Sequence, residues 1–91
     1  MAGLLEGKRG LVMGVANERS IAWGIARACA EQGAQLAFSY QGEAFGRRVQ
    51  PLAESLGAPL LVDMDVTEDA SLDAGFAQLS SAWPDGFDFL I

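Results

Sequence analysis

Four short apolar runs, spaced about 25 residues apart, constrain the fold of this 91-residue chain more than any other feature of its sequence. The runs cover residues 10–15, 35–40, 60–66 and 87–91. Each is nearly continuous in apolar residues, which is typical of parallel strands covered on both faces. Parallel strands need crossover connections, and such crossovers are right-handed. The sequence therefore predicts an α/β fold, the first half of a Rossmann-like doubly wound parallel sheet (β-α-β-α-β-α-β, strand order 3-2-1-4).

Three apolar stripes with helical spacing lie between these runs and predict one helix in each gap. They consist of Ile21, Ile25, Ala28 and Cys29; of Val49, Leu52, Ala53 and Leu56; and of Leu72, Phe76, Leu79 and Trp83. Gly33 follows the first stripe, where a helix C-terminus favours a left-handed residue. Asp69 and Ser71 are candidate caps for the third helix. We expect seven side chains to be packing residues: Trp23, Cys29, Phe38, Phe76, Trp83, Phe87 and Phe89.

The charged residues exclude several kinds of site. The chain has six basic and twelve acidic residues, a net charge of −6, and all six basic residues precede residue 49. This acidic balance is a poor match for a nucleic-acid binder. With no histidine and one cysteine, the chain cannot form a zinc cluster, an internal disulfide, or a Ser-His-Asp or Cys-His triad. We expect no metal site and no nucleic-acid partner.

Membrane insertion and secretion are also not indicated by the sequence. No run approaches the ~18 apolar residues of a membrane span. The first residues lack the basic segment and long apolar stretch of a secretory signal. The expected setting is therefore the cytoplasm.

The segment at residues 14–24, which follows the first predicted strand, is the candidate ligand loop. In an open α/β sheet, ligands bind beyond the carboxyl ends of the strands. Gly14 lets the chain turn sharply there. Ser20 can cap the next helix or donate a hydroxyl to a phosphate, and the first amides of that helix suit a pyrophosphate. The segment has neither a G-x-G-x-x-G nor a P-loop pattern, so an ordinary strand-turn-helix with a serine cap remains open.

The pattern G-x5-S-I-A-W-G over residues 14–24 resembles the cofactor loop of bacterial NADH-dependent enoyl-(acyl-carrier-protein) reductases. These are divergent members of the short-chain dehydrogenase/reductase superfamily, whose ordinary members carry Thr-Gly-x3-Gly-Ile-Gly. The resemblance covers the whole chain and includes residues 5–9, 36–41 and 65–71, as well as Trp83 and Pro84.

The resemblance implies a cofactor site formed by Gly14, Ser20, Ile21, Gln41, Asp65 and Val66. The first three match positions lining the pyrophosphate and the adjoining ribose, and Gln41 matches one near the adenosine ribose. Asp65 matches the acceptor for the adenine amino group, with Val66 as the apolar contact beside it. The residues alone leave two alternatives: Asp65, with Asp63, as an edge or cap residue, and Gln41 as a solvated turn residue.

The residues after the second predicted strand favour NADH over NADPH. Recognition of a 2′-phosphate usually needs a basic residue at this turn. The turn here carries Gln41 and Glu43, whereas Arg47 and Arg48 lie in the following helix. Glu43 would repel a 2′-phosphate. Arg19, in the candidate loop, is interpreted as a solvated charge.

The catalytic residues that the resemblance implies are absent from this chain. The superfamily uses a tyrosine and a lysine, spaced Tyr-x6-Lys in the enoyl reductases and Tyr-x3-Lys elsewhere. Tyr40 is the one tyrosine; Arg47 stands at the x6 spacing and Ala44 at the x3 spacing, and Lys8 lies upstream. We therefore expect these residues to bind cofactor but not to catalyse.

The fourth apolar run reaches residue 91 without a turn, cap or polar terminator. Such a strand would leave an apolar edge unpaired. We therefore expect residues 1–91 to be the N-terminal part of a single dinucleotide-binding Rossmann domain, truncated within the fourth strand.

The function that the resemblance implies for the full-length protein is NADH-dependent reduction of a 2-enoyl thioester on acyl carrier protein, in type II fatty-acid elongation. A homotetramer is implied on the same ground. Two alternatives remain open: another short-chain reductase acting on a carbonyl, and a non-catalytic dinucleotide-binding fragment.

Overall fold

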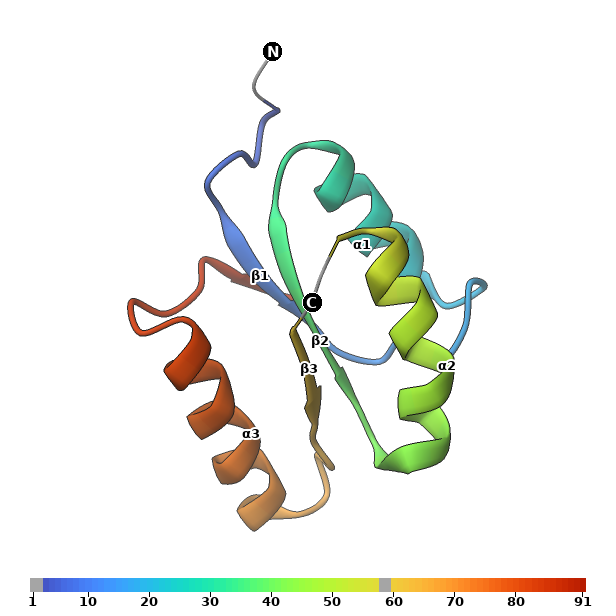
Figure 1. The fold of residues 1–91 in the computed structure, drawn as a ribbon, viewed down its shortest axis with the longest axis vertical. Coiled ribbons are helices and arrows are strands. Elements are labelled where there is room, and N and C mark those ends of the chain that lie inside the picture. Colours follow the sequence, from blue (N-terminus) through green and yellow to red (C-terminus); the bar gives the residue numbers. More distant parts are fainter. Residues whose placement is uncertain (1–2, 58–59) are drawn as a thin grey trace.

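The computed structural model describes residues 3–57 and 60–91 and has a four-stranded parallel sheet at its centre (Figure 1). The elements in chain order are β1 (Arg9–Val12), α1 (Ile21–Glu31), β2 (Gln35–Tyr40), α2 (Gly42–Ser55), β3 (Leu60–Asp63), α3 (Asp69–Ala82) and β4 (Phe89–Leu90). The strand order is β3-β2-β1-β4, and each neighbouring pair is parallel. The predicted fold class, element order and strand order are confirmed.

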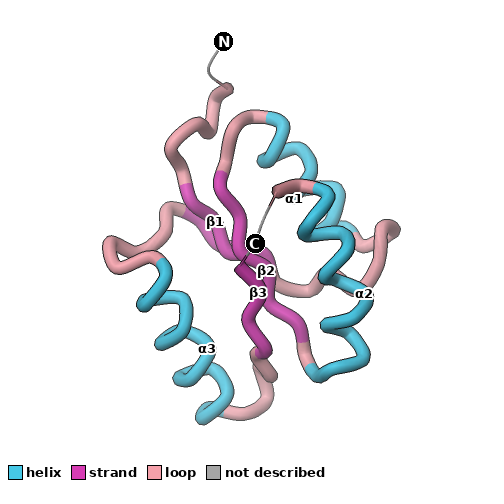
Figure 2. Tube along the Cα trace, in the orientation of Figure 1, coloured by secondary structure: helices cyan, strands magenta, loops and turns pink. Residues whose placement is uncertain are grey.

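The helices cover the two faces of the sheet, as in a doubly wound fold. Helices α1 and α2 lie on one face and α3 on the other (Figures 1 and 2). Successive strand residues point to opposite faces, so Val12 and Phe38 pack under α1 and α2. Leu11 and Ala37 pack under α3. Burial on both faces explains why the strands read as continuous apolar runs.

Helix α1 buries a different face from the one that the sequence predicts. The predicted stripe began with Ile21 and Ile25, but their side chains are 84% and 42% exposed. The buried residues are Trp23 and Ala26. The Trp23 ring lies 6.3 Å from the Phe38 ring, centroid to centroid. The helix is apolar on nearly every side, so two stripes competed, and the large Trp23 ring settles the rotation by packing on β2.

The other two stripes agree with the structure except at Phe76. Val49 and Ala53 of α2 are fully buried, as predicted. Leu79 of α3 is also buried, but the Phe76 side chain is 39% exposed. The buried neighbour is instead Gly75, where an added Cβ would lie 2.6 Å from Met64 Cε. Because α3 approaches β3 closely at Gly75, the neighbouring Phe76 side chain is left partly exposed to solvent.

Two further expectations concern the helix ends and membrane insertion. Gly33 has φ +92°, so the predicted left-handed residue after α1 is confirmed. Among residues 3–57 and 60–91, no helix is long and apolar enough to cross a lipid bilayer.

Candidate functional site

A cavity of about 270 Å³ opens at the carboxyl ends of β1, β2 and β3. Its walls come from the segments that follow these strands and from the first turn of α2. The lining residues are Met13, Gly14, Val15, Ala16, Ser39, Tyr40, Gln41, Phe45, Met64 and Val66. Apolar side chains dominate these walls, with Gln41 as a polar group. This is the edge of the sheet where open α/β folds bind ligands.

The loop between β1 and α1 is held by the Ser20 hydroxyl. Gly14 has φ +84°, a conformation that lets the chain turn at the end of β1. Ser20 Oγ accepts hydrogen bonds from the amides of Ala16 at 3.0 Å and Asn17 at 3.2 Å. Ser20 occupies the N-cap position of α1 but makes no side-chain capping bond there. The interpretation of Ser20 as a helix cap is therefore wrong, and its hydroxyl orders the loop instead.

Asp63, at the end of β3, caps the neighbouring helix α2. Its Oδ1 accepts a hydrogen bond of 3.1 Å from the Gly42 amide, the first residue of α2. Gln41, at the N-cap position, makes no side-chain capping bond. The parallel pairing of β2 and β3 places Tyr40 opposite Asp63, which brings the carboxylate within reach. The sequence left a cap role open for Asp63, and the structure shows which helix it caps.

Asp65 anchors the turn between β3 and α3. Its Oδ1 accepts hydrogen bonds from the Thr67 amide at 2.9 Å and the Thr67 hydroxyl at 2.7 Å. Its own amide donates to Ser71 Oγ at 2.8 Å. The Thr67 hydroxyl and then its amide lower the pKa of the Asp65 carboxyl below its ordinary value of 3.8; partial loss of hydration opposes them, and the nearby Gln41 side chain adds a smaller lowering. Asp65 is therefore an ionised acceptor beside the cavity.

Ser71 does not act as the predicted cap of α3. The helix begins at Asp69, and Glu68 holds the N-cap position without a side-chain capping bond. The Ser71 hydroxyl reaches back to the end of β3 instead, as Ser20 reaches back to the end of β1. Both serines stand at helix starts and hold the backbone of the preceding loop.

The predicted site residues fall into two groups. Gly14, Gln41 and Val66 line the cavity. Three do not line it: Ser20 lies in the loop after β1, Ile21 is the first residue of α1, and Asp65 lies in the loop after β3. The Ile21 side chain is exposed and therefore does not belong to the core. All six predicted residues lie at the carboxyl ends of the strands.

Sequence analysis missed two side chains that shape the cavity. Met64 is 2% exposed and separates the two aspartates at the end of β3. Phe45 projects from the first turn of α2, with the Arg48 guanidinium 5.7 Å from its ring centroid. A methionine between two aspartates after a buried strand was a usable signal for Met64. Phe45 was left out of the second predicted stripe, although it precedes Val49 by four residues, a spacing that places both on one helix face.

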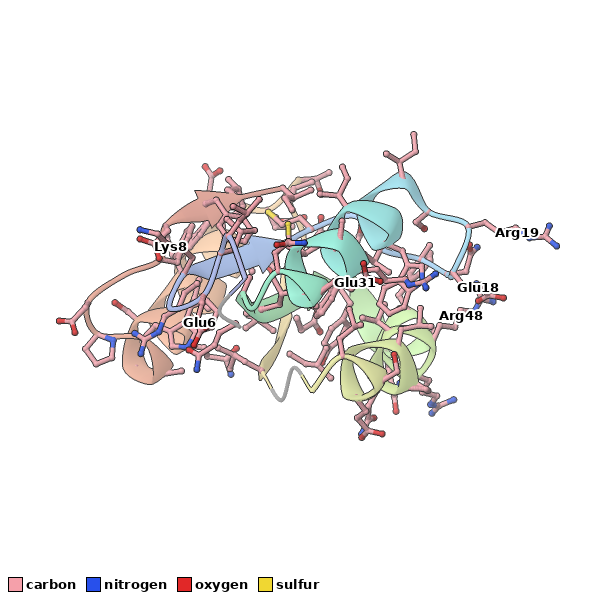
Figure 3. All side chains as sticks on the ribbon, turned by 90° about the horizontal axis from the view of Figure 1, so that it is seen from above. Glu6, Lys8, Glu18, Arg19, Glu31 and Arg48 are labelled. Carbon is pink, nitrogen blue, oxygen red and sulfur yellow. The ribbon has the colours of Figure 1, made fainter. Side chains whose placement is uncertain are left out.

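The basic side chains of the first half of the chain do not line the cavity. Figure 3 shows Arg19 on the loop after β1, pointing away from the body, and Lys8 on the opposite side of the molecule. Arg47 is paired with Glu43 at 2.9 Å. The interpretation of Arg19 as a loop charge agrees with this view.

The fold and the cavity define the class to which this chain belongs: it is part of a doubly wound α/β fold of the Rossmann type, with a cavity at the carboxyl edge of its sheet. The model of the family described as enoyl-(acyl carrier protein) reductase matches residues 14–91. The chain belongs to this family, and the resemblance found in the sequence is confirmed.

Individual relatives give the same result. The enoyl-(acyl-carrier-protein) reductase (NADH) 1 of Rhizobium meliloti is 55% identical over 82 residues, which are 90% of this chain and 30% of that protein. The structure of FabI from Candidatus Liberibacter asiaticus superposes with a TM-score of 0.94 at 47% identity, covering 99% of this chain and 34% of that one. The reductase of Anaplasma phagocytophilum, solved in complex with NAD, superposes with a TM-score of 0.93 at 48% identity over the same shares. The chain thus spans about a third of its relatives' length.

Proposed function

We propose that this chain forms the adenosine and pyrophosphate side of the NADH site in an enoyl-(acyl-carrier-protein) reductase. The observation that carries the proposal is the cavity of about 270 Å³ at the carboxyl ends of β1–β3, in a chain of this reductase family. The NAD complex of a 48% identical relative supports the choice of cofactor.

The residues around the cavity fit an adenosine group. Its apolar walls, including Met64, Phe45 and Val66, suit the faces of a flat base. Asp65 supplies an ionised oxygen acceptor for the adenine amino group. Gln41 stands at the wall where β2 ends, which is the usual place of the adenosine ribose.

The pyrophosphate fits the start of α1. Gly14 brings backbone close to this point, and Ser20 keeps the loop in one conformation through its two amide bonds. The first turn of α1 carries no acidic residue, so the positive end of the helix dipole is not offset there. Ile21, exposed at the first position of this helix, would contact the adjoining ribose.

The chemistry belongs to the bound cofactor, which supplies a hydride from nicotinamide C4 to the β-carbon of a 2-enoyl thioester while a proton reaches the α-carbon. The described residues contribute binding and orientation. Tyr40 ends β2, whereas Lys8 precedes β1, so the two lie at opposite ends of a parallel pair. They form no catalytic couple, as the sequence predicts.

The remaining features of the full-length protein are proposed together. Residues 1–91 would be the N-terminal part of one dinucleotide-binding Rossmann domain, whose further part holds the nicotinamide, the acid and the acyl pocket. The substrate would be an enoyl group on acyl carrier protein, in cytoplasmic fatty-acid synthesis. A homotetramer is the proposed assembly.

The test is the loss of NADH absorbance on addition of a 2-enoyl thioester of acyl carrier protein to the full-length enzyme. We expect turnover with this substrate, none with a 3-ketoacyl thioester, and a KM for NADH about 10-fold higher in Asp65→Asn, because a hydrogen bond to a charged acceptor weakens. The control Asp73→Asn removes an exposed charge from α3 and should leave KM unchanged. Turnover of only the carbonyl substrate would favour another short-chain reductase, and NADH binding without any turnover would favour a binding module.

A further inference from the structure

We propose that Asp63 is the residue that makes the adenosine end of this site reject a 2′-phosphate and thereby selects NADH over NADPH. The inference rests on the proposed function. It assigns to β3 a role that α/β dinucleotide sites usually place at the end of the second strand.

The end of β2 carries no acid in this chain. In dinucleotide-binding folds, an Asp or Glu at this point commonly accepts a hydrogen bond from the ribose 2′-hydroxyl, and a basic residue accommodates a 2′-phosphate. Here β2 is followed by the neutral Gln41 and then by Gly42. Gln41 lines the cavity, so this end of β2 faces the proposed ribose. An acid that favours a free 2′-hydroxyl over a 2′-phosphate must therefore come from another element.

Asp63 places a carboxylate at this point. Its Oδ1 lies 3.1 Å from the Gly42 nitrogen, the first amide of α2. The unpaired amides of a helix N-terminus, with the positive end of the dipole, normally attract phosphate. In this chain the first of them already donates to Asp63. A 2′-phosphate near Gln41 would meet a fixed negative charge where it would otherwise find a donor.

Glu43 is a weaker candidate for the same role. Its carboxylate is paired with Arg47 at 2.9 Å, and both side chains are largely exposed to water. The net charge of this pair is close to zero. Within residues 3–57 and 60–91, the structure contains one ion pair, between Glu43 and Arg47. Among these residues, no cation therefore contacts Asp63 to offset its charge. Asp63, which has no such partner among them, is therefore the stronger candidate of the two.

The test compares two adenosine ligands on the full-length enzyme: adenosine 5′-monophosphate and adenosine 2′,5′-bisphosphate, by titration calorimetry. Asp63→Asn keeps an oxygen that can accept from Gly42 but removes the charge. We expect the variant to bind the bisphosphate about 10-fold more tightly, because the repulsion between one carboxylate and a phosphate group in near contact weakens binding by about this factor. Affinity for the monophosphate should stay within about two-fold. The kcat/KM ratio of NADPH to NADH should rise in parallel.

Two variants serve as controls. Glu43→Gln removes the charge that is paired with Arg47, and Asp73→Asn makes the same change in net charge on α3. Both should shift the ratio of the two affinities less than Asp63→Asn does. The proposal is overturned if Asp63→Asn leaves that ratio within two-fold of the wild type, or if Glu43→Gln shifts it as far.

A measurement on the unaltered enzyme guards against misfolding of the variant. Repulsion between exposed charges is screened by salt. The preference for the monophosphate should therefore shrink as ionic strength rises, and an unchanged preference would contradict the proposal. An enzyme that binds neither NADH nor the monophosphate would instead refute the proposed function. Failure of the Asp63 proposal and failure of the proposed function are therefore distinguishable.

Discussion

Three short polar side chains organise the loops around the cavity, and each accepts hydrogen bonds from backbone outside its own turn of helix or strand. Ser20 holds the loop after β1, Ser71 holds the end of β3, and Asp63 holds the start of α2. A backbone amide that is held by a side chain does not need a neighbouring strand or helix. These residues therefore give the irregular segments a defined shape where a ligand must contact backbone.

Asp65 shows how such a contact affects a protonation state. The Thr67 hydroxyl lies 2.7 Å from Asp65 Oδ1 and makes the largest contribution to the lowered pKa of that carboxyl. A native pKa below the unfolded value stabilises the fold at every pH above the unfolded value. This stabilisation is lost as pH falls through the lower native pKa.

Thr67→Val is predicted to raise the pKa of Asp65 toward 3.8, because it removes the hydroxyl donor and leaves the backbone amide in place. The measurement is an NMR titration of the Asp65 carboxyl carbon. Ser81→Ala, which removes a hydroxyl bonded within α3, should leave that titration unchanged. The difference in stability between wild type and Thr67→Val should be full above pH 3.8 and shrink in more acid solution. An Asp65 pKa equal in both proteins would contradict the assigned cause.

At the scale of elements, the pairing of β1 with β4 depends on a residue without a side chain. Gly10 is opposite Phe89 in the parallel register. A Cβ at Gly10 would overlap the ring of Phe89. The ring packs against the core cluster under α1 and α2. The Phe89 ring thus occupies the space that a side chain at position 10 would fill.

Gly10→Ala is predicted to destabilise the protein by about 1–3 kcal/mol, the usual cost of overpacking a well-filled core. Thermal unfolding of the full-length protein measures the effect. Phe89→Leu makes the neighbouring side chain smaller, so adding Gly10→Ala to that background should cost less. Equal losses in the two backgrounds would mean that the clash with Phe89 is not the cause.

At the scale of the whole molecule, the described residues leave apolar surface in contact with water. One edge of β4 pairs with β1, and within the described residues its other edge has no partner strand. Leu90, on β4, is 56% exposed. Exposed edges of this kind pair readily with other chains. The relatives are about three times longer than this chain, which accords with the proposal that further chain covers this surface.

The 91-residue chain expressed alone is therefore predicted to self-associate as its concentration rises, measured by sedimentation velocity. Leu90→Lys puts a charge on the free edge and should reduce the association. Leu4→Lys is the matched control, since Leu4 is also exposed but lies on the loop before β1. A monomeric wild-type chain, or equal effects of the two lysines, would contradict the role of the β4 edge.

Several features of the fold could be predicted because they depend on local pattern. Apolar runs and helical stripes indicate strands and helices directly, and the handedness of crossovers then restricts the strand order. Val49 and Ala53 were found because α2 has one apolar face. The six proposed cofactor residues lie toward the carboxyl edge of the sheet because each stands at the end of a predicted strand or in the segment after it.

The sequence by itself determined the order of the elements, the topology of the sheet and the edge at which the cavity lies. The tertiary structure alone decided the rotation of α1, the outward position of Phe76 and the partner of Asp63. The physical reason is distance along the chain. Periodicity describes neighbours within one element, whereas the bond from Gly42 to Asp63 joins residues 21 positions apart. Such a contact depends on how β2 and β3 pair and on how closely α2 approaches them, which no local pattern specifies.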